Sequence, residues 1–169
     1  MDASIEQFLL WPPFYTLQPN SDTKKQQLEL WSQVILEYAR KHKMYNATPE
    51  DFSEITQRPQ INRALNEEFK ETLFEFMGNQ GSAVREGSSF LMFWKSPASW
   101  AEKVYKWADS TGKIGSVETL EGICTGDETR NQEFYGVPLN FMRIVLNSLQ
   151  KANKAEVFKI GEDTAVKFL

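Results

Sequence analysis

Apolar residues recur at helical spacing in the first long segment of the chain, residues 22–43. The positions that define this stripe are Leu28, Trp31, Val34, Ile35 and Tyr38. Because side chains three or four residues apart share one face of a helix, the spacing predicts an amphipathic helix with one buried side. Asp22 is the expected N-cap, and the basic run Arg40–Lys43 lies in the last turn, where the helix dipole favours cations.

A second helix and a hairpin are predicted for the rest of the first half. The helical stripe consists of Leu65, Phe69, Leu73, Phe76 and Met77. Gly78 and Gly81 are expected to end this helix. A Gly-Ser-Ser turn at 87–89 then separates the aromatic strand 90–94 from a weaker partner strand at 82–86. Residues 47–60 contain two prolines and no clear period, which predicts a loop with room for one short helical turn.

The second half of the chain repeats this order. Ser96 and Pro97 are expected to start a helix as N-cap and first helical residue, and Gly112 is expected to end it. A short helix at 119–125 and a polar loop at 126–136 follow. The inner stripes of the two long helices are Trp100, Val104, Trp107 and Ala108, and then Met142, Val145, Leu146 and Leu149 after Pro138. Last, two alternating strands flank Gly161-Glu162-Asp163, which is a hairpin signal.

The element order predicts the fold class. Each half reads as a helix, a short element, a helix and a hairpin, which is the winged-helix variant of the helix-turn-helix plan. We therefore expect a mainly α protein with small β-hairpins (α+β). It would consist of an extended Pro/aromatic N-terminal tail at residues 1–20 and two tandem winged-helix domains at residues 21–95 and 96–169.

The tail contains two consecutive prolines among aromatic residues, in the run Trp11, Pro12, Pro13, Phe14 and Tyr15. Consecutive prolines fix φ and bias a chain toward extended polyproline II. Ordering the backbone of one residue costs about 1–2 kcal/mol of conformational entropy. Burial of an aromatic ring contributes roughly 1.5–3 kcal/mol of hydrophobic free energy. From the residues alone, two outcomes stay open: insertion into another protein's groove, or folding back over the first helix. The run also matches the PPxY pattern that WW domains bind.

Composition and charge narrow the class of protein. The 169 residues are 41% hydrophobic and 13% aromatic, which suffices for one medium domain or two small ones. No apolar run approaches the roughly 20 residues of a membrane-spanning helix. The single cysteine, Cys124, excludes an internal disulfide framework and suits a reducing compartment such as the cytosol. The formal net charge of -4 disfavours binding to nucleic acid.

Residue types that carry catalysis are scarce. The only histidine, His42, lies in the charged run "RKHK", and nothing marks Cys124 as its partner. One Cys and one His are too few for the usual zinc sites, and no phosphate-binding loop is present. We therefore expect no enzyme activity, no cofactor and no metal, and a function in protein contacts.

A DNA-binding or transcription-complex winged helix is the main alternative. That function requires basic residues on the exposed side of the third helix. The third helix of the first half carries instead Glu67, Glu68, Glu71 and Glu75 against Arg63 and Lys70. A surface of this charge repels a phosphate backbone, so we expect no direct contact with nucleic acid.

Four stretches resemble a known family. "PPFYTLQPNSDTKKQQLELW" is similar to the N-terminal motif of the smallest-subunit family of ESCRT-II, the endosomal sorting complex. The runs "FLMFWKSPASWAEKVYKWADSTG", "SVETLEGICTGDETRNQEFYGV" and "KAEVFKIGEDTAVKFL" resemble the second half of the same family. The resemblance is weakest from Ala47 to Arg85. The hairpin strand there reads "SAVRE", where the family usually has an aromatic residue.

The resemblance implies a fold and a set of partners. The family fold is two tandem winged helices, and two copies join one each of two larger ESCRT-II subunits. By motif match, the residues that contact those subunits are Pro12, Pro13, Phe14 and Tyr15, together with Trp11. The second winged helix, within residues 116–169, would recruit an ESCRT-III subunit. The implied function is non-catalytic sorting of ubiquitinated cargo into multivesicular bodies, by a cytoplasmic protein that reaches endosomal membranes only through its partners.

Overall fold

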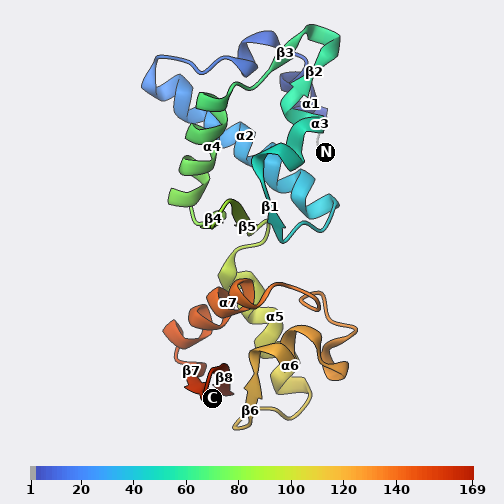
Figure 1. Cartoon of the computed structure of the whole chain (residues 1–169), viewed down its shortest axis with the longest axis vertical. Helices are drawn as coiled ribbons and strands as arrows, with labels where there is room; N and C mark the ends of the chain where they lie inside the picture. Colours follow the sequence, from blue (N-terminus) through green and yellow to red (C-terminus); the bar gives the residue numbers. More distant parts are fainter. Residues whose placement is uncertain (1–2) are drawn as a thin grey trace. The chain divides into compact units, whose positions relative to one another are not determined.

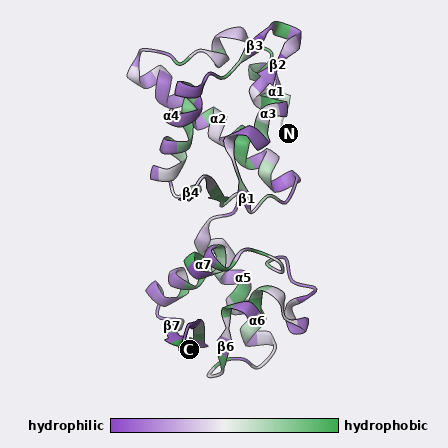
Figure 2. Ribbon diagram, in the orientation of Figure 1, coloured by the Kyte–Doolittle hydropathy of each residue, from purple (hydrophilic) through white to green (hydrophobic). Residues whose placement is uncertain are grey.

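The computed structural model describes residues 3–169, which form two compact units (Figure 1). The first unit ends at Trp94 and the second begins at Lys95. The segment that we assigned to a separate tail lies within the first unit. Figure 2 shows that hydrophobic and hydrophilic residues alternate around the long helices, as expected for amphipathic elements.

The first unit consists of short helices and strands around two long helices. Its helices are α1 (Ala3–Leu9), α2 (Ser21–Lys41), α3 (Ser53–Thr56) and α4 (Glu67–Asn79), with 3-10 turns η1 (Pro12–Tyr15), η2 (Pro49–Phe52) and η3 (Pro59–Ile61). Its strands are β1 (Asn46–Ala47), β2 (Gln57–Arg58), β3 (Arg63–Ala64), β4 (Ala83–Glu86) and β5 (Ser89–Met92). The segment 47–60 is thus more structured than the loop that we predicted.

The two long helices begin at asparagine caps. The side chain of Asn20 accepts hydrogen bonds from the backbone N–H groups of Asp22 and Thr23, at 3.0 and 3.1 Å. The predicted cap, Asp22, is therefore wrong, because Asn20 follows Pro19 in extended conformation and reaches the free N–H groups first. Asn66 caps α4 in the same way, with its side chain accepting from Phe69 N at 2.8 Å.

The core of the first unit comes from the predicted helical stripes. On α2 the buried apolar residues are Leu28, Trp31, Val34, Ile35 and Ala39, and on α4 they are Phe69, Leu73, Phe74 and Met77. Phe76, which we placed in the stripe, is only half-buried, and Phe74 takes its place. The hairpin β4–β5 forms as predicted, with Gly87 at φ 64° in its turn, and β1 extends it to a sheet of order β1-β5-β4.

The second unit has the same plan. Its helices are α5 (Pro97–Ser110), α6 (Leu120–Thr125) and α7 (Leu139–Lys151), with a 3-10 turn η4 (Asp127–Thr129), and its strands are β6 (Val117–Thr119), β7 (Ala155–Ile160) and β8 (Asp163–Phe168). Ser96 caps α5 as predicted, accepting from Ser99 N at 3.1 Å. The sheet order β6-β8-β7 matches that of the first unit, because in both sheets the last strand is central and pairs with its hairpin partner and with a short earlier strand, β1 or β6.

The loop 126–136 has a polar composition but contributes one aromatic residue to the core. Phe134 is 1% exposed, and its ring meets that of Trp107 edge-on at 6.0 Å between centroids. Gly136 N donates to the carbonyl of Cys124 at 2.7 Å, which fixes the end of the loop. The loop is therefore anchored to the core by an aromatic residue inside a run of polar ones.

Candidate functional site

The proline-aromatic segment is not extended. Pro12–Tyr15 form a 3-10 turn between extended residues at Trp11 and Thr16, and α1 precedes it. Phe14 N donates to the carbonyl of Trp11 at 3.0 Å, and Thr16 N donates to that of Pro13 at 3.2 Å. This corrects the expected polyproline II tail. Proline fixes φ near -65°, which suits a 3-10 turn as well as polyproline II, and its missing N–H is tolerated at the start of a helix.

Two side chains of α2 hold the backbone of this segment. Gln27 Nε2 donates to the carbonyl of Phe14 at 3.1 Å and to that of Thr16 at 2.8 Å. Trp31 Nε1 donates to the same Phe14 carbonyl at 2.9 Å. Gln27 itself is 6% exposed, so these bonds satisfy a buried amide that would otherwise be costly. The sequence did not predict these hydrogen bonds, although Gln27 and Trp31 both lie in the stretch that carries the resemblance.

Aromatic stacking holds the side chains. The ring of Phe14 stacks on Trp31 with centroids 4.5 Å apart and planes 6° from parallel, and the ring of Tyr15 meets Trp31 edge-on at 5.3 Å. Both rings are nearly inaccessible, at 2% and 4% exposure. Tyr15 Oη donates to the carbonyl of Leu9 at 2.9 Å. Burial raises the pKa of the Tyr15 hydroxyl, and the guanidinium of Arg58 acts in the opposite direction.

The other part of the segment faces solvent. Leu10 is 57% and Trp11 53% exposed, Pro13 is exposed and Pro12 half-buried. Beside them lies a groove of about 360 Å³, lined by Phe8, Trp11, Pro13, Phe14, Gln18, Thr23, Gln26, Gln27 and Leu30. We call the exposed face of residues 10–13, together with this groove, the tail surface. Adjacent exposed Leu and Trp side chains are typical of a protein contact site.

The structure therefore separates the five predicted contact residues into two groups. Trp11, Pro12 and Pro13 contribute to the tail surface, whereas Phe14 and Tyr15 lie in the core of the first unit. Leu10 was not among the predicted residues, because it precedes the motif from which the contact residues were assigned. The assignment of all five residues to a partner contact stays a prediction.

A groove with an exposed leucine lies in the second unit. A groove of about 140 Å³ is lined by Thr119, Leu120, Glu121, Leu139, Arg143, Glu162, Asp163 and Thr164. Leu139, the first residue of α7, is 48% exposed at this groove. Arg143 Nη1 donates to Asn140 Oδ1 at 2.9 Å. Three carboxylates and one guanidinium give the groove an excess of negative charge around a leucine.

The single cysteine and the single histidine belong to different units. Burial raises the pKa of the Cys124 thiol to about 12, so it stays protonated at neutral pH and is a poor nucleophile. His42 is exposed at the end of α2, with its ring 4.2 Å from that of Tyr38. Within residues 3–169, no group of His, Cys, Asp or Glu side chains is arranged to hold a metal ion.

Together, the two repeated units define the chain as a tandem winged-helix protein. The mainly α fold with small antiparallel hairpins is thereby confirmed. A model of the family described as "ESCRT-II complex subunit" matches residues 8–138.

Relatives and known structures agree with this match. Vacuolar protein-sorting-associated protein 25 of Xenopus laevis is 34% identical over 163 residues, which cover 94% of each chain. The human protein of the same name is 32% identical, covering 94% of this chain and 93% of its own. A crystal structure of subunit VPS25 of ESCRT-II superposes with a TM-score of 0.80 at 27% identity, covering 96% of both chains. The chain belongs to the ESCRT-II complex subunit family, and the resemblance read from its sequence is confirmed.

Proposed function

We propose that this chain is a non-catalytic adaptor subunit of an ESCRT-II complex. A chain in a crystal structure of ESCRT-II with VPS22, VPS25 and VPS36 covers 99% of this chain with a TM-score of 0.79 and 26% identity. The observation that supports docking most directly is the tail surface, where Leu10 and Trp11 are more than half exposed although Phe14 and Tyr15 in the same segment are buried. The tail surface binds the larger winged-helix subunits.

The two groups of tail residues act differently in this proposal. Trp11, Pro12 and Pro13 touch the partner, while Phe14 and Tyr15 anchor the segment on Trp31. The anchored segment is already ordered before it binds, so association costs less conformational entropy than the docking of a free tail. Phe14 and Tyr15 thus contribute to assembly by positioning the exposed residues.

The second winged helix recruits an ESCRT-III subunit in multivesicular-body sorting of ubiquitinated cargo. Its groove at Leu139 supports this step, because an exposed leucine among carboxylates suits an amphipathic helix that has basic residues beside its apolar face. Two copies of the chain in one complex would present two such surfaces and raise the effective concentration of the recruited subunit.

Among residues 3–169, no helix is both long and apolar enough to span a bilayer. We assign the protein to the cytoplasm and to endosomal membranes through its partners.

Assembly with the larger subunits tests the docking step. The double variant Leu10→Ala, Trp11→Ala is mixed with the two larger subunits, and the mass of the product is measured by light scattering after size-exclusion chromatography. We expect loss of the complex with unchanged thermal unfolding of the free chain. Ile160→Ala, which truncates a residue of the second unit with 54% exposure, is the control and retains assembly. A full-size complex with the double variant would contradict docking through this surface.

Pulldown tests the recruitment step separately. Leu139→Asp should remove binding to the ESCRT-III subunit while assembly with the larger ESCRT-II subunits is retained, because the two surfaces belong to different units. Retained ESCRT-III binding by this variant would rule out the groove at Leu139 as the contact.

A further inference from the structure

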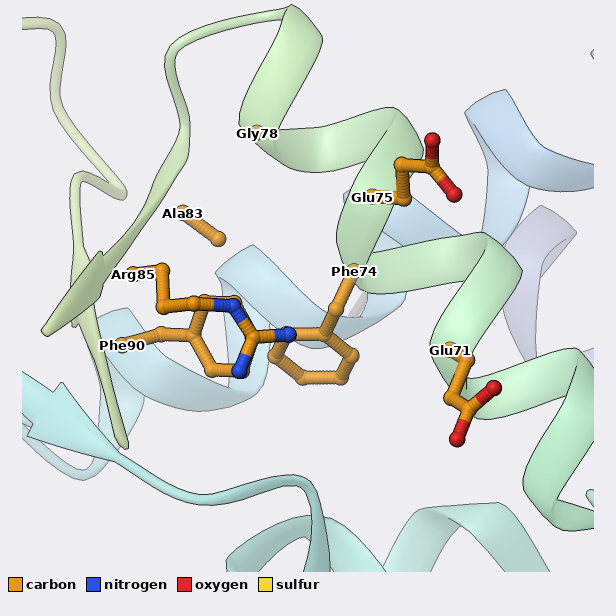
Figure 3. A pocket seen from close by; sticks show the side chains of 7 residues that line it. All are labelled: Glu71, Phe74, Glu75, Gly78, Ala83, Arg85 and Phe90. Atoms are coloured by element: carbon orange, nitrogen blue, oxygen red, sulfur yellow. The ribbon is translucent and has the colours of Figure 1, made fainter. Parts of the chain in front are cut away.

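A third groove, of about 500 Å³, lies between α4 and the hairpin β4–β5 of the first unit (Figure 3). It is lined by Glu71, Phe74, Glu75, Gly78, Ala83, Arg85 and Phe90. Small residues on both walls leave the space open. A Cβ atom on Gly78 would stand 3.4 Å from the carbonyl oxygen of Ala83, an ordinary contact, so backbone packing does not demand a glycine there. The volume is within the range of known ligand sites, roughly 300–1,000 Å³.

The floor of the groove is aromatic and already holds a cation. The rings of Phe74 and Phe90 lie with centroids 4.8 Å apart, and the guanidinium carbon of Arg85 is 4.7 Å from the centroid of Phe90. The face of an aromatic ring carries negative partial charge, which attracts such a group. Arg85 is an exposed side chain on the hairpin, so it can swing out of the groove without disturbing the core.

The α4 side of the groove is acidic. Glu71 and Glu75 stand one turn apart on exposed positions, and Figure 3 shows their carboxylates on the side of Phe74 away from Arg85. Over its whole length α4 carries four glutamates and one lysine. In a winged helix that binds DNA, this third helix lies in the major groove between the two phosphate backbones. Here its charge repels phosphates and attracts a cationic partner.

We propose that this groove is a docking site for a basic segment of a partner protein. A lysine or arginine of that segment enters beside Phe74, packs its aliphatic stem on the aromatic floor, and places its charge between Glu71 and Glu75. Arg85 is displaced from Phe90 on binding, and so competes with the incoming cation. Charge complementarity selects this occupant over nucleic acid or an acidic peptide. The groove is separate from the tail surface, so the inference does not depend on the proposed docking of the tail.

Fluorescence anisotropy with a labelled hexa-arginine peptide tests the site on the full chain at low salt. The double variant Glu71→Gln, Glu75→Gln should weaken binding at least fivefold. Arg85→Ala should strengthen it at least threefold, because it removes the competing cation. The control, Glu102→Gln with Asp109→Asn, makes the same change in net charge on exposed residues of α5 in the second unit and should alter the affinity less than twofold. In the wild type, the peptide should also shift the amide NMR signals of Gly78 and Ala83.

Each of the following outcomes would overturn the inference. Equal weakening by the control variant would mean that net charge alone attracts the peptide. Weaker binding of Arg85→Ala, or binding of a labelled hexaglutamate peptide that depends on Arg85, would mean that the groove accepts carboxylates. Absence of binding, or amide shifts confined to other parts of the chain, would exclude the groove. Since the substituted side chains are exposed, all variants should unfold within about 2 °C of the wild type.

Discussion

The replacement of Phe14 by alanine tests whether the tail is docked on its own domain. The ring is 2% exposed and stacks on Trp31 at 4.5 Å. Truncation of a buried phenylalanine in a packed core typically costs about 3–5 kcal/mol, which includes the aromatic pair. The docked segment is held on α2 by the bonds from Gln27 and Trp31 and by the stacked ring, and it can detach while the rest of the unit stays folded. If detaching the segment costs less than leaving a cavity, the measured loss in the free energy of unfolding equals the free energy of docking.

Urea titration of the free chain, followed by amide NMR signals of the first unit, measures this loss. With a slope of roughly 1–3 kcal/mol per molar urea, the midpoint should fall by about 1 M or more. Detachment without global unfolding has its own signature, because Trp31 Nε1–H loses its bond to the Phe14 carbonyl and exchanges faster with solvent. Signals of the second unit should keep their wild-type midpoint.

Trp11→Ala is the matched control, since it removes a larger ring three residues away at an exposed position. Its cost in stability should stay below about 1 kcal/mol, as is usual for surface substitutions. Equally small costs for the two variants would refute our reasoning, because they would show that the segment is not docked in the free chain. In that case Phe14 would be available to a partner's cleft, as the extended-tail interpretation assumed.

The remaining predictions concern titration and capping. The raised pKa of Tyr15 stabilises the fold below the usual tyrosine value of about 10, and this contribution is lost as pH rises through the folded pKa. In alkaline urea titrations, Tyr15→Phe should therefore flatten the loss of stability of the first unit. The Lys95 ammonium, and then that of Lys103, lowers the pKa of Glu133. Glu133→Gln should destabilise the second unit by about 0.5–1 kcal/mol at pH 7, and this difference should be lost as pH falls through the lowered pKa of Glu133. An unchanged difference in strong acid would exclude the ion pairs as the cause. Ser96→Ala should cost about 1 kcal/mol in thermal unfolding of the second unit, and Ser96→Asp should restore most of it.

The docked tail also bears on the third interpretation of the PPFY run. A WW domain that reads this pattern needs the tyrosine, yet Tyr15 is 4% exposed and donates a hydrogen bond to Leu9. Binding to a WW domain would require the segment to detach first. The pattern in the sequence therefore overstates the accessibility of the motif.

Local patterns determined the helices, hairpins and fold class of this protein. Stripes such as Met142, Val145 and Leu149 are buried as their spacing predicts, and glycines such as Gly161, at φ 65°, turn the predicted hairpins. These features depend on side-chain periodicity and backbone preference within about ten residues, so a sequence shows them directly. The resemblance of the first stretch to a known family was also visible without coordinates.

Tertiary structure alone decided the conformation of the tail and the division of its residues. Pro12 and Pro13 fix φ but leave ψ open, and the choice between extended chain and 3-10 turn depends on Gln27 and Trp31, more than ten residues away. Which rings are buried and which are exposed follows from that distant contact, because burial is a property of packing between elements. The groove between α4 and the hairpin β4–β5 likewise depends on tertiary structure, because its walls come from separate elements.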